Sequence, residues 1–162
     1  MRRAWLLLVT ALPVCSAYAA PACAVTEPPR QIFVPPPPFD AVPYPGDFYL
    51  GTDGFWTSLP ANGVWETLHD QPTYDRRKIG WFSKDFWWLS GQEAQLNVEA
   101  RKLDGSHTSI HGGSATNAFL SDRQESFMLS AIEFPSTGCW EITARFRGQE
   151  LKFTVLVTAP SN

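Results

Sequence analysis

The amino-acid sequence predicts an all-β protein, a single antiparallel β-sandwich that follows a proline-rich N-terminal arm. The first observation is that the 162-residue chain contains 14 prolines and 11 glycines, which interrupt it too often for long helices. The second is that its hydrophobic residues fall in short runs, several alternating with polar residues, between turn signals spaced about 8 to 12 residues apart. The third is that 44% of the residues are hydrophobic and 14% aromatic, whereas only 18% are charged, which excludes an intrinsically disordered chain. We expect roughly six to eight strands in about 110 residues.

Residues 1–19 have the layout of a secretory signal peptide. Arg2 and Arg3 precede the apolar run Ala4–Val14, and residues 17–19 read Ala-Tyr-Ala, so we expect cleavage after Ala19. The apolar run is too short to cross a bilayer, which needs about 20 apolar residues. No later segment predicts a transmembrane helix, and the mature chain is therefore expected to be exported, either periplasmic or extracellular.

Residues 20–45 form the expected proline-rich arm. The consecutive prolines Pro35–Pro38 favour an extended polyproline II conformation without internal hydrogen bonds. We interpret the arm as a stiff spacer or as a segment laid along the domain, and we disfavour a ligand for a proline-binding module because the chain is exported. The apolar residues 32–34 and Phe39 predict contacts between the arm and the domain.

The sandwich is expected over residues 46–158, followed by a short tail at 159–162. Its first clear signal is a β-hairpin. Two β-favouring runs, Phe55–Leu59 and Val64–Leu68, flank a Pro-Ala-Asn-Gly turn at residues 60–63.

The middle of the domain has weaker strand signals. Arg77–Phe82 favours a strand, and Gln95–Arg101 alternates between apolar and polar residues. Residues 105–117 are rich in Gly, Ser, Thr, His and Asn, which is typical of a loop.

The last third of the domain has the strongest pattern. Ser126–Phe134 is an apolar run of strand length, and a Pro-Ser-Thr-Gly turn follows it. The segments Cys139–Phe146 and 151–157 then alternate, which predicts an antiparallel hairpin with one face on the core. The side chains expected at the centre of this core are Trp140, Ile142, Phe146, Phe153 and Val155.

The cysteines predict one disulfide. Cleavage after Ala19 removes Cys15 and leaves Cys23 and Cys139, and two cysteines in an oxidising compartment normally pair. Alternation in the strand places Cys139 on the face opposite Trp140, away from the core. The alternative is a lipoprotein in which Cys23 carries a lipid anchor and Cys139 remains a free thiol.

Several segments match a known pattern in order and spacing, including Trp-Thr-x-Leu-Pro and Phe-Pro-x-x-Gly-Cys-Trp-Glu-x-Thr. They are Gly54–Pro60, Gly63–Trp65, Lys84–Trp88, Arg101–Gly105 and Phe134–Thr143. The chain thereby resembles a group of small secreted or lipid-anchored bacterial proteins of uncharacterised function, which also carry a cysteine where Cys23 sits. The resemblance covers residues 46–158 and implies a single immunoglobulin-like domain. It brings no catalytic residues, and Lys102 stands where arginine is expected.

The chemistry-bearing residues do not predict an enzyme, a cofactor or a metal site. The net charge of -3 argues against nucleic-acid binding. His107 and His111 have a spacing that suits zinc on a helix, but they lie in a polar loop without further ligands, and His69-Asp70 has no activated nucleophile. The sequence contains neither Gly-x-Ser-x-Gly nor His-Glu-x-x-His.

The aromatic segment Phe86, Trp87 and Trp88 is the candidate ligand contact. Successive side chains of an extended chain point to opposite faces, so at least one of these rings should reach the surface or lie under a loop. An exposed aromatic patch suits a protein or a sugar ring. The alternative is that the proline-rich arm covers Trp87.

Two classes of function follow from the sequence. The first is a non-catalytic envelope module that binds a protein or glycan, or that has a structural role. The second is an enzyme or enzyme inhibitor with its site in the loops around 69–76 and 105–125. A cleft in which His69, His107 or His111 meets a carboxylate would favour the second class.

Overall fold

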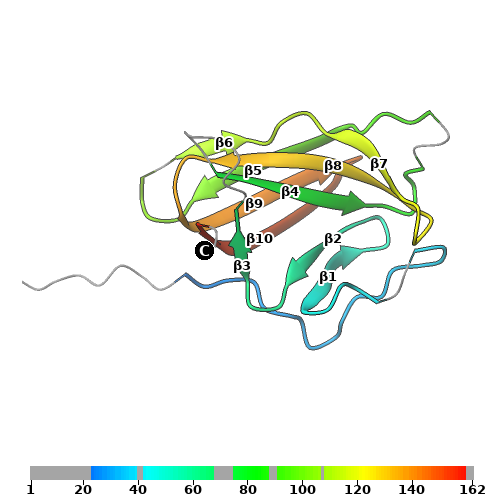
Figure 1. The fold of residues 1–162 in the computed structure, drawn as a ribbon, viewed down its shortest axis with the longest axis horizontal. Coiled ribbons are helices and arrows are strands. Elements are labelled where there is room, and N and C mark those ends of the chain that lie inside the picture. Colours follow the sequence, from blue (N-terminus) through cyan, green and yellow to red (C-terminus); the bar gives the residue numbers. More distant parts are fainter. Residues whose placement is uncertain (1–22, 40–41, 68–74, 88–90, 107, 160–162) are drawn as a thin grey trace, which may run out of the picture.

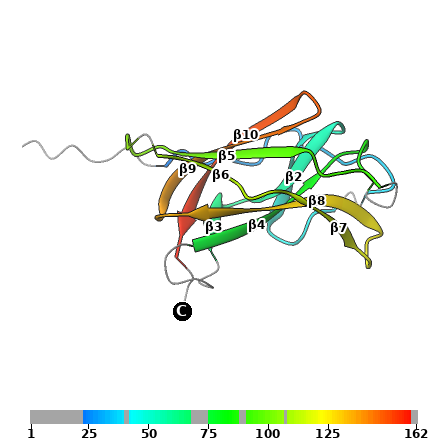
Figure 2. The same cartoon turned by 90° about the horizontal axis from the view of Figure 1, so that it is seen from above.

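Ten β-strands form two five-stranded sheets that pack face to face (Figures 1 and 2). This computed structural model describes residues 23–39, 42–67, 75–87, 91–106 and 108–159. The first sheet has the order β1 (Asp47–Thr52), β2 (Phe55–Pro60), β4 (Asp75–Phe82), β8 (Glu125–Phe134) and β7 (Thr116–Leu120). The second has the order β3 (Val64–Glu66), β10 (Gln149–Thr158), β9 (Gly138–Phe146), β5 (Leu96–Lys102) and β6 (Ser109–His111). The predicted all-β, two-layer class is confirmed.

The predicted C-terminal hairpin is also confirmed. β9 and β10 pair in antiparallel register, with Trp140 opposite Val155 and Ile142 opposite Phe153. All four of these side chains, and that of Phe146, are at most 2% exposed in the core between the sheets. Burial of each large apolar side chain contributes about 1.5 to 3 kcal/mol, so this hairpin supplies much of the stability of the core.

The predicted hairpin between residues 55–59 and 64–68 is wrong. β2 pairs with β1 and β4, whereas β3 lies in the other sheet, parallel to β10, with Val64 opposite Leu156. The turn at residues 60–63 therefore carries the chain from one sheet to the other. Gly63 has a φ of 66°, and a Cβ atom there would overlap Val25. Because β3 pairs in parallel, the sandwich is not wholly antiparallel.

Two short strands also correct the predicted loop at residues 105–117. β6 (Ser109–His111) and the first residues of β7 lie within it. Both are edge strands, so only one side of each is paired and their polar sequences are tolerated. The chain has more strands than the expected six to eight for this reason.

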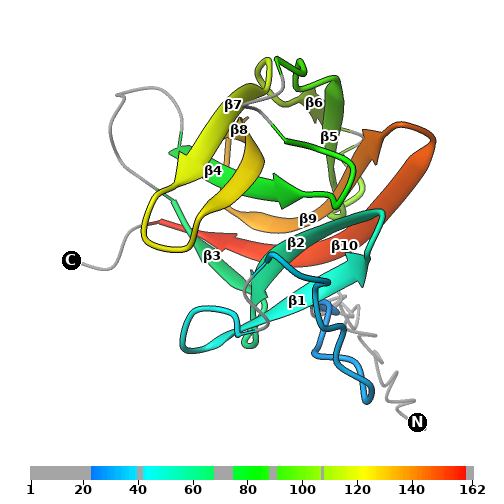
Figure 3. The same cartoon turned by 90° about the vertical axis from the view of Figure 1, so that its right-hand side faces the viewer.

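The N-terminal segment, residues 23–39, lies against the sandwich beside β1 (Figures 1 and 3). A disulfide joins Cys23 to Cys139, with 5.4 Å between their Cα atoms. Thr26 donates its N–H to the Thr154 carbonyl at 2.8 Å, and Thr154 donates its N–H to the Thr26 hydroxyl at 2.8 Å. These contacts fasten the start of the segment to the second sheet.

A second aromatic cluster holds the far part of the same segment. Phe39 is 8% exposed and packs edge-on against Trp56, with ring centroids 4.8 Å apart. Phe33 contacts the same indole at 5.6 Å. Phe39, Tyr49, Trp56 and Phe82 form a small core on the outer face of the first sheet, which explains why this sheet has aromatic residues on both faces.

Candidate functional site

The first sheet divides between β2 and β4. The two strands pair only at Trp56 with Phe82 and at Thr57 with Trp81, whereas β4 pairs with β8 along seven residues. At the point of division the Thr57 hydroxyl donates to the Gly80 carbonyl at 2.8 Å. Beyond it, the two strands diverge and one edge of β4 faces an opening in the middle of the sheet.

A cleft of about 240 Å³ occupies this opening, and we name it the β2–β4 cleft. It receives side chains from both diverging strands, from the segment that precedes β1 and from β8. Its lining includes Tyr44, Asp47, Ser58, Trp65, Arg77, Lys78, Ile79, Gly80, Phe82, Leu120 and Phe127. The cleft therefore combines aromatic rings, one carboxylate and two cationic side chains.

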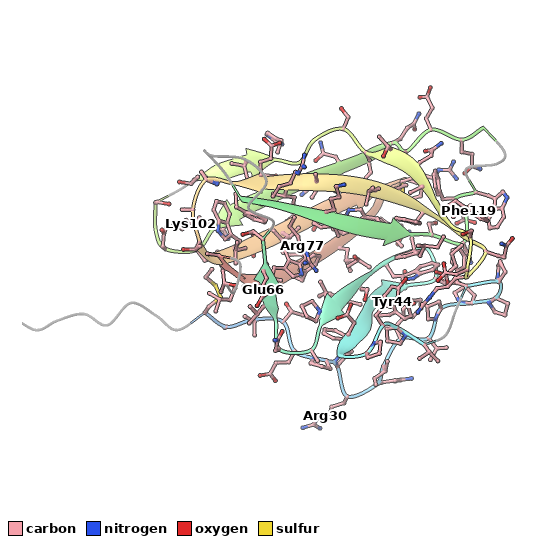
Figure 4. The ribbon with its side chains drawn as sticks, in the orientation of Figure 1. Arg30, Tyr44, Glu66, Arg77, Lys102 and Phe119 are labelled. Atoms are coloured by element: carbon pink, nitrogen blue, oxygen red, sulfur yellow. A yellow bond between two sulfur atoms is a disulfide. The ribbon has the colours of Figure 1, made fainter. Side chains whose placement is uncertain are left out.

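Arg77 is the cation that projects from β4 toward β3, the strand that carries Glu66 (Figure 4). Its guanidinium lies 5.8 Å from the centre of the Trp65 ring and donates one hydrogen bond, to the Glu66 carbonyl at 3.3 Å. Burial lowers the pKa of Arg77, and the nearby charges of Asp47 and Glu66 oppose that shift. Among the described residues, no carboxylate forms an ion pair with Arg77. A guanidinium has five N–H donors, and the described residues engage only one of those of Arg77.

Other polar and aromatic groups of the cleft are already engaged. The Ser58 hydroxyl donates to Asp47 at 2.8 Å. The guanidinium of Arg123 lies over Tyr44, 4.1 Å from the ring centre. Phe82 stacks on Trp56 and on Phe127, with centroids 5.9 and 5.5 Å away. Because these ring faces are covered, a ligand in the cleft would contact the ring edges and the Arg77 guanidinium.

The structure describes two of the three residues of the predicted aromatic contact, and it places them differently. Phe86 is 1% exposed and packs edge-on against Phe146 in the core, so its ring has no surface to offer a ligand. Trp87 is half-buried, and the ring of Phe119 lies edge-on to it at 6.3 Å. Phe119 of β7, and not the N-terminal segment, makes the described aromatic contact with Trp87. Trp88 lies outside the described residues.

The loops considered for an enzyme are described in part, because His69, His107 and residues 70–74 lie outside the described residues. His111 is exposed on β6 and pairs in register with Glu99. The Ser109 hydroxyl donates directly to Glu99 at 2.8 Å. A serine nucleophile is most often activated by a histidine that accepts its proton, and here the Glu99 carboxylate takes that hydrogen bond. Within the described ranges, no group of three His, Cys, Asp or Glu residues could hold a metal ion.

Lys102 and Ser136 form a second pair of a basic side chain and a hydroxyl, with 2.8 Å between Nζ and Oγ. Asp104 forms an ion pair with the same ammonium at 2.9 Å. Hydrogen bonds from Ser106 and Lys102 hold the pKa of Asp104 well below its usual range. Nζ of Lys102 donates to the Ser136 hydroxyl and pairs with the Asp104 carboxylate, so in this geometry the lysine is a donor to the serine and not an acceptor of its proton.

The same contacts connect two segments of the chain, 101–105 and 134–143. Lys102 reaches Ser136, and Leu103 donates its N–H to the Cys139 carbonyl at 2.8 Å. The segments 101–105 and 134–143 therefore brace each other beside the disulfide. Their residues have a structural explanation that needs no ligand.

No known protein family, curated protein or solved structure matches this chain. Within the part of the chain that the structure describes, no helix is long and apolar enough to cross a membrane. The β2–β4 cleft was not predicted from the sequence. One signal could have pointed to it. Arg77 lies on the same face of β4 as the buried residues Ile79 and Trp81, where an apolar residue is expected.

Proposed function

We propose that this protein is an exported, non-catalytic, immunoglobulin-like module of a bacterial envelope that binds a protein or glycan in the β2–β4 cleft. The observation that carries the proposal is the division of the first sheet, which leaves an open strand edge beside a guanidinium with spare hydrogen-bond donors. A ligand that completes the hydrogen bonds of a strand edge and of a partly buried cation lowers the free energy of the complex.

Strand order supports the immunoglobulin-like assignment. The order β2, β4, β8, β7 corresponds to the four-stranded sheet of an immunoglobulin domain, and β5, β9, β10 corresponds to the facing sheet. Antibody domains join the second and sixth strands by a disulfide. The corresponding strands here are β4 and β9, and they carry Trp81 and Trp140 in the core instead. The proline-rich segment is proposed to be an arm that closes over the outer face of the first sheet.

Export is supported by the signal-peptide pattern and by the disulfide, because disulfides persist in oxidising compartments. The same disulfide bears on lipid anchoring. The sulfur of Cys23 cannot bond to Cys139 and carry a lipid in the same molecule. We therefore propose the unlipidated form, with the lipoprotein as the alternative.

A non-catalytic role is supported by the chemistry of the two serine clusters. The Ser109 hydroxyl donates to the Glu99 carboxylate, and the Ser136 hydroxyl accepts a hydrogen bond from Lys102, which is paired with Asp104. Among the described residues, neither hydroxyl is hydrogen-bonded to a histidine. An enzyme or enzyme inhibitor that uses the loops 69–76 and 105–125 remains the alternative.

Trp87 supports a second candidate surface. It lies in the connection between β4 and β5, which corresponds to a recognition loop of antibody variable domains. Arg147, in the turn between β9 and β10, donates to the Asp85 carbonyl at 2.9 Å, so two such loops meet there. This argument is an analogy of fold, whereas the cleft rests on the geometry of this chain.

The test is retention of the mature protein on isolated envelope fractions, before and after protease or glycan-hydrolase treatment. The double variant Tyr44→Ala/Arg77→Gln should lower retention about tenfold or more, because a charge-assisted hydrogen bond contributes about 1.5 to 3 kcal/mol. Lys152→Gln, which removes one charge from the opposite sheet, should retain binding. Loss only in Trp87→Ala would assign binding to the second surface, and no retention of the wild type would reject the binding function.

A further inference from the structure

We infer that the ligand of the β2–β4 cleft is an extended polypeptide segment, which pairs with the open edge of β4 as an added strand and places an acidic side chain on Arg77. This inference rests on the proposed binding function and names the class of its ligand. It is carried by the unpaired backbone of β4, by the hydrogen bonding of Arg77 and by the engagement of the aromatic faces in the cleft.

The backbone of β4 provides the first argument. The Gly80 carbonyl points toward β2, since it accepts the Thr57 hydroxyl. Backbone groups two residues apart in a strand point to the same side, so the N–H and carbonyl groups of Lys78 also face the opening. β2 does not pair with Lys78, and no other described backbone group is bonded to it on that side. An extended polypeptide added at a sheet edge is a common mode of peptide recognition.

Arg77 provides the second argument. Its planar guanidinium matches a carboxylate with two parallel hydrogen bonds, and it makes only one bond within the described chain, to a carbonyl. The nearest acidic lining residue, Asp47, accepts the Ser58 hydroxyl and does not form an ion pair with Arg77. The exposed Lys78 adds a second positive charge to the lining. The cleft therefore favours an anionic ligand, in contrast to the net charge of -3 of the whole chain.

Alternation along β4 specifies the pattern of the ligand. Ile79 and Trp81 point into the core and Arg77 shares their side, whereas Lys78 and Gly80 face outward. In a strand paired with β4, a residue opposite Arg77 would also point inward, and its two neighbours, opposite Arg76 and Lys78, would point outward. The rings of Phe82 and Phe127 lie at Gly80, so only the neighbour on the Lys78 side approaches them. The expected ligand has an aspartate or glutamate with an apolar residue on one side of it.

The aromatic rings argue against a glycan in this cleft. Sugar rings bind to open aromatic faces, but Arg77 lies over Trp65, Arg123 lies over Tyr44, and Phe82 stacks on two neighbours. The volume of about 240 Å³ is also below the range of about 300 to 1,000 Å³ that is usual for small-molecule pockets. A strand that bonds mainly through its backbone needs no larger cavity.

The experiment is a selection of random heptapeptides on the mature, disulfide-bonded protein, followed by affinity measurement on the selected peptides as blocked synthetic probes. We expect enrichment of an acidic residue with an apolar residue next to it on one side. N-methylation of one set of alternate amides should abolish binding, whereas methylation of the other set should change it little, because only one edge of an added strand bonds to β4.

Variants of the protein identify the acidic contact. Arg77→Gln should weaken the selected peptide about tenfold or more and remove its preference for glutamate over glutamine, and Arg77→Lys should recover part of that preference. Lys152→Gln should bind as the wild type does. Enrichment without an acidic position, equal losses on methylating either set, or binding of acidic oligosaccharides in place of peptides would overturn the inference. Envelope retention that depends on the cleft, together with no peptide enrichment, would reject the ligand class and leave the binding function standing.

Discussion

Two buried serines on β8 provide a matched test of the core. Ser130 is 2% exposed, and its hydroxyl accepts a 2.8 Å hydrogen bond from Nε1 of Trp81, which is fully buried. Ser130→Ala removes that acceptor and leaves a buried indole N–H without a partner. Such a loss costs about 1 to 3 kcal/mol, and we expect the free energy of unfolding to fall by that amount.

Ser126 is the control on the same strand and the same face. It is fully buried, and its hydroxyl has no hydrogen-bond partner among the described residues. Ser126→Ala therefore removes a hydroxyl that is buried without compensation, and we expect the free energy of unfolding to stay within about 0.5 kcal/mol or to rise by up to about 1 kcal/mol. The two substitutions are chemically identical and differ only in the bond that one serine makes.

Urea unfolding with a constant m value measures both changes. A double-mutant cycle with Trp81→Phe, which deletes the donor, should give a coupling energy of about 1 kcal/mol between Trp81 and Ser130. The same cycle with Ser126 should give no coupling. Equal effects of the two serine substitutions, or a zero coupling energy for the bonded pair, would refute the assignment of the Trp81 donor to Ser130.

Three further predictions concern the core, the disulfide and one ion pair. Trp140→Ala should lower the free energy of unfolding by about 3 to 5 kcal/mol, and a variant that melts like the wild type would contradict the role of Trp140 in the core. Unreduced, denatured mature protein should contain almost no free thiol, and removal of the bond between Cys23 and Cys139, which spans 116 residues, should cost at most about 4.8 kcal/mol in the entropic treatment. One thiol per chain together with a lipid on Cys23 would establish the lipoprotein instead. Asp104→Asn should have a lower free energy of unfolding than the wild type at neutral pH. Because folding lowers the pKa of Asp104, this difference should shrink as the pH falls below about 4. A constant difference across that range would exclude the ion pair as its cause.

The sequence predicts the last two strands well because their pattern is local. From Trp140 to Phe146, every second residue is apolar, and a strand with one buried face needs only that alternation to set its register. The same pattern places Cys139 outward, where Cys23 of the N-terminal segment reaches it. Local patterns are sufficient wherever neighbouring strands in the sequence are also neighbours in the sheet.

The failed hairpin and the cleft depend on long-range pairing. The turn at residues 60–63 has the composition of a hairpin loop, but β3 pairs with β10. The partners of Val64 and Glu66 are Leu156 and Thr158, about 92 positions later in the sequence. The separation of β2 from β4 results from that change of sheet, so the cleft cannot be derived from either strand alone. Phe86 illustrates the same limit, because its ring is buried by residues distant in the sequence, among them Phe146.

The closing contacts of β10 have a consequence for the order in which a newly made chain can fold. The last strand, β10, pairs with β3 and accepts a hydrogen bond from the N–H of Thr26. It also lies beside Cys139 of β9, which forms the disulfide with Cys23. At about 5 to 20 residues per second of synthesis, Cys23 emerges about 6 to 23 s before Cys139. During that interval Trp65 lacks the ring of Phe153, which packs against it from β10, and a nascent chain that ends before β10 leaves that side of Trp65 exposed. The segment that begins at Cys23 is therefore synthesised early and fastened late.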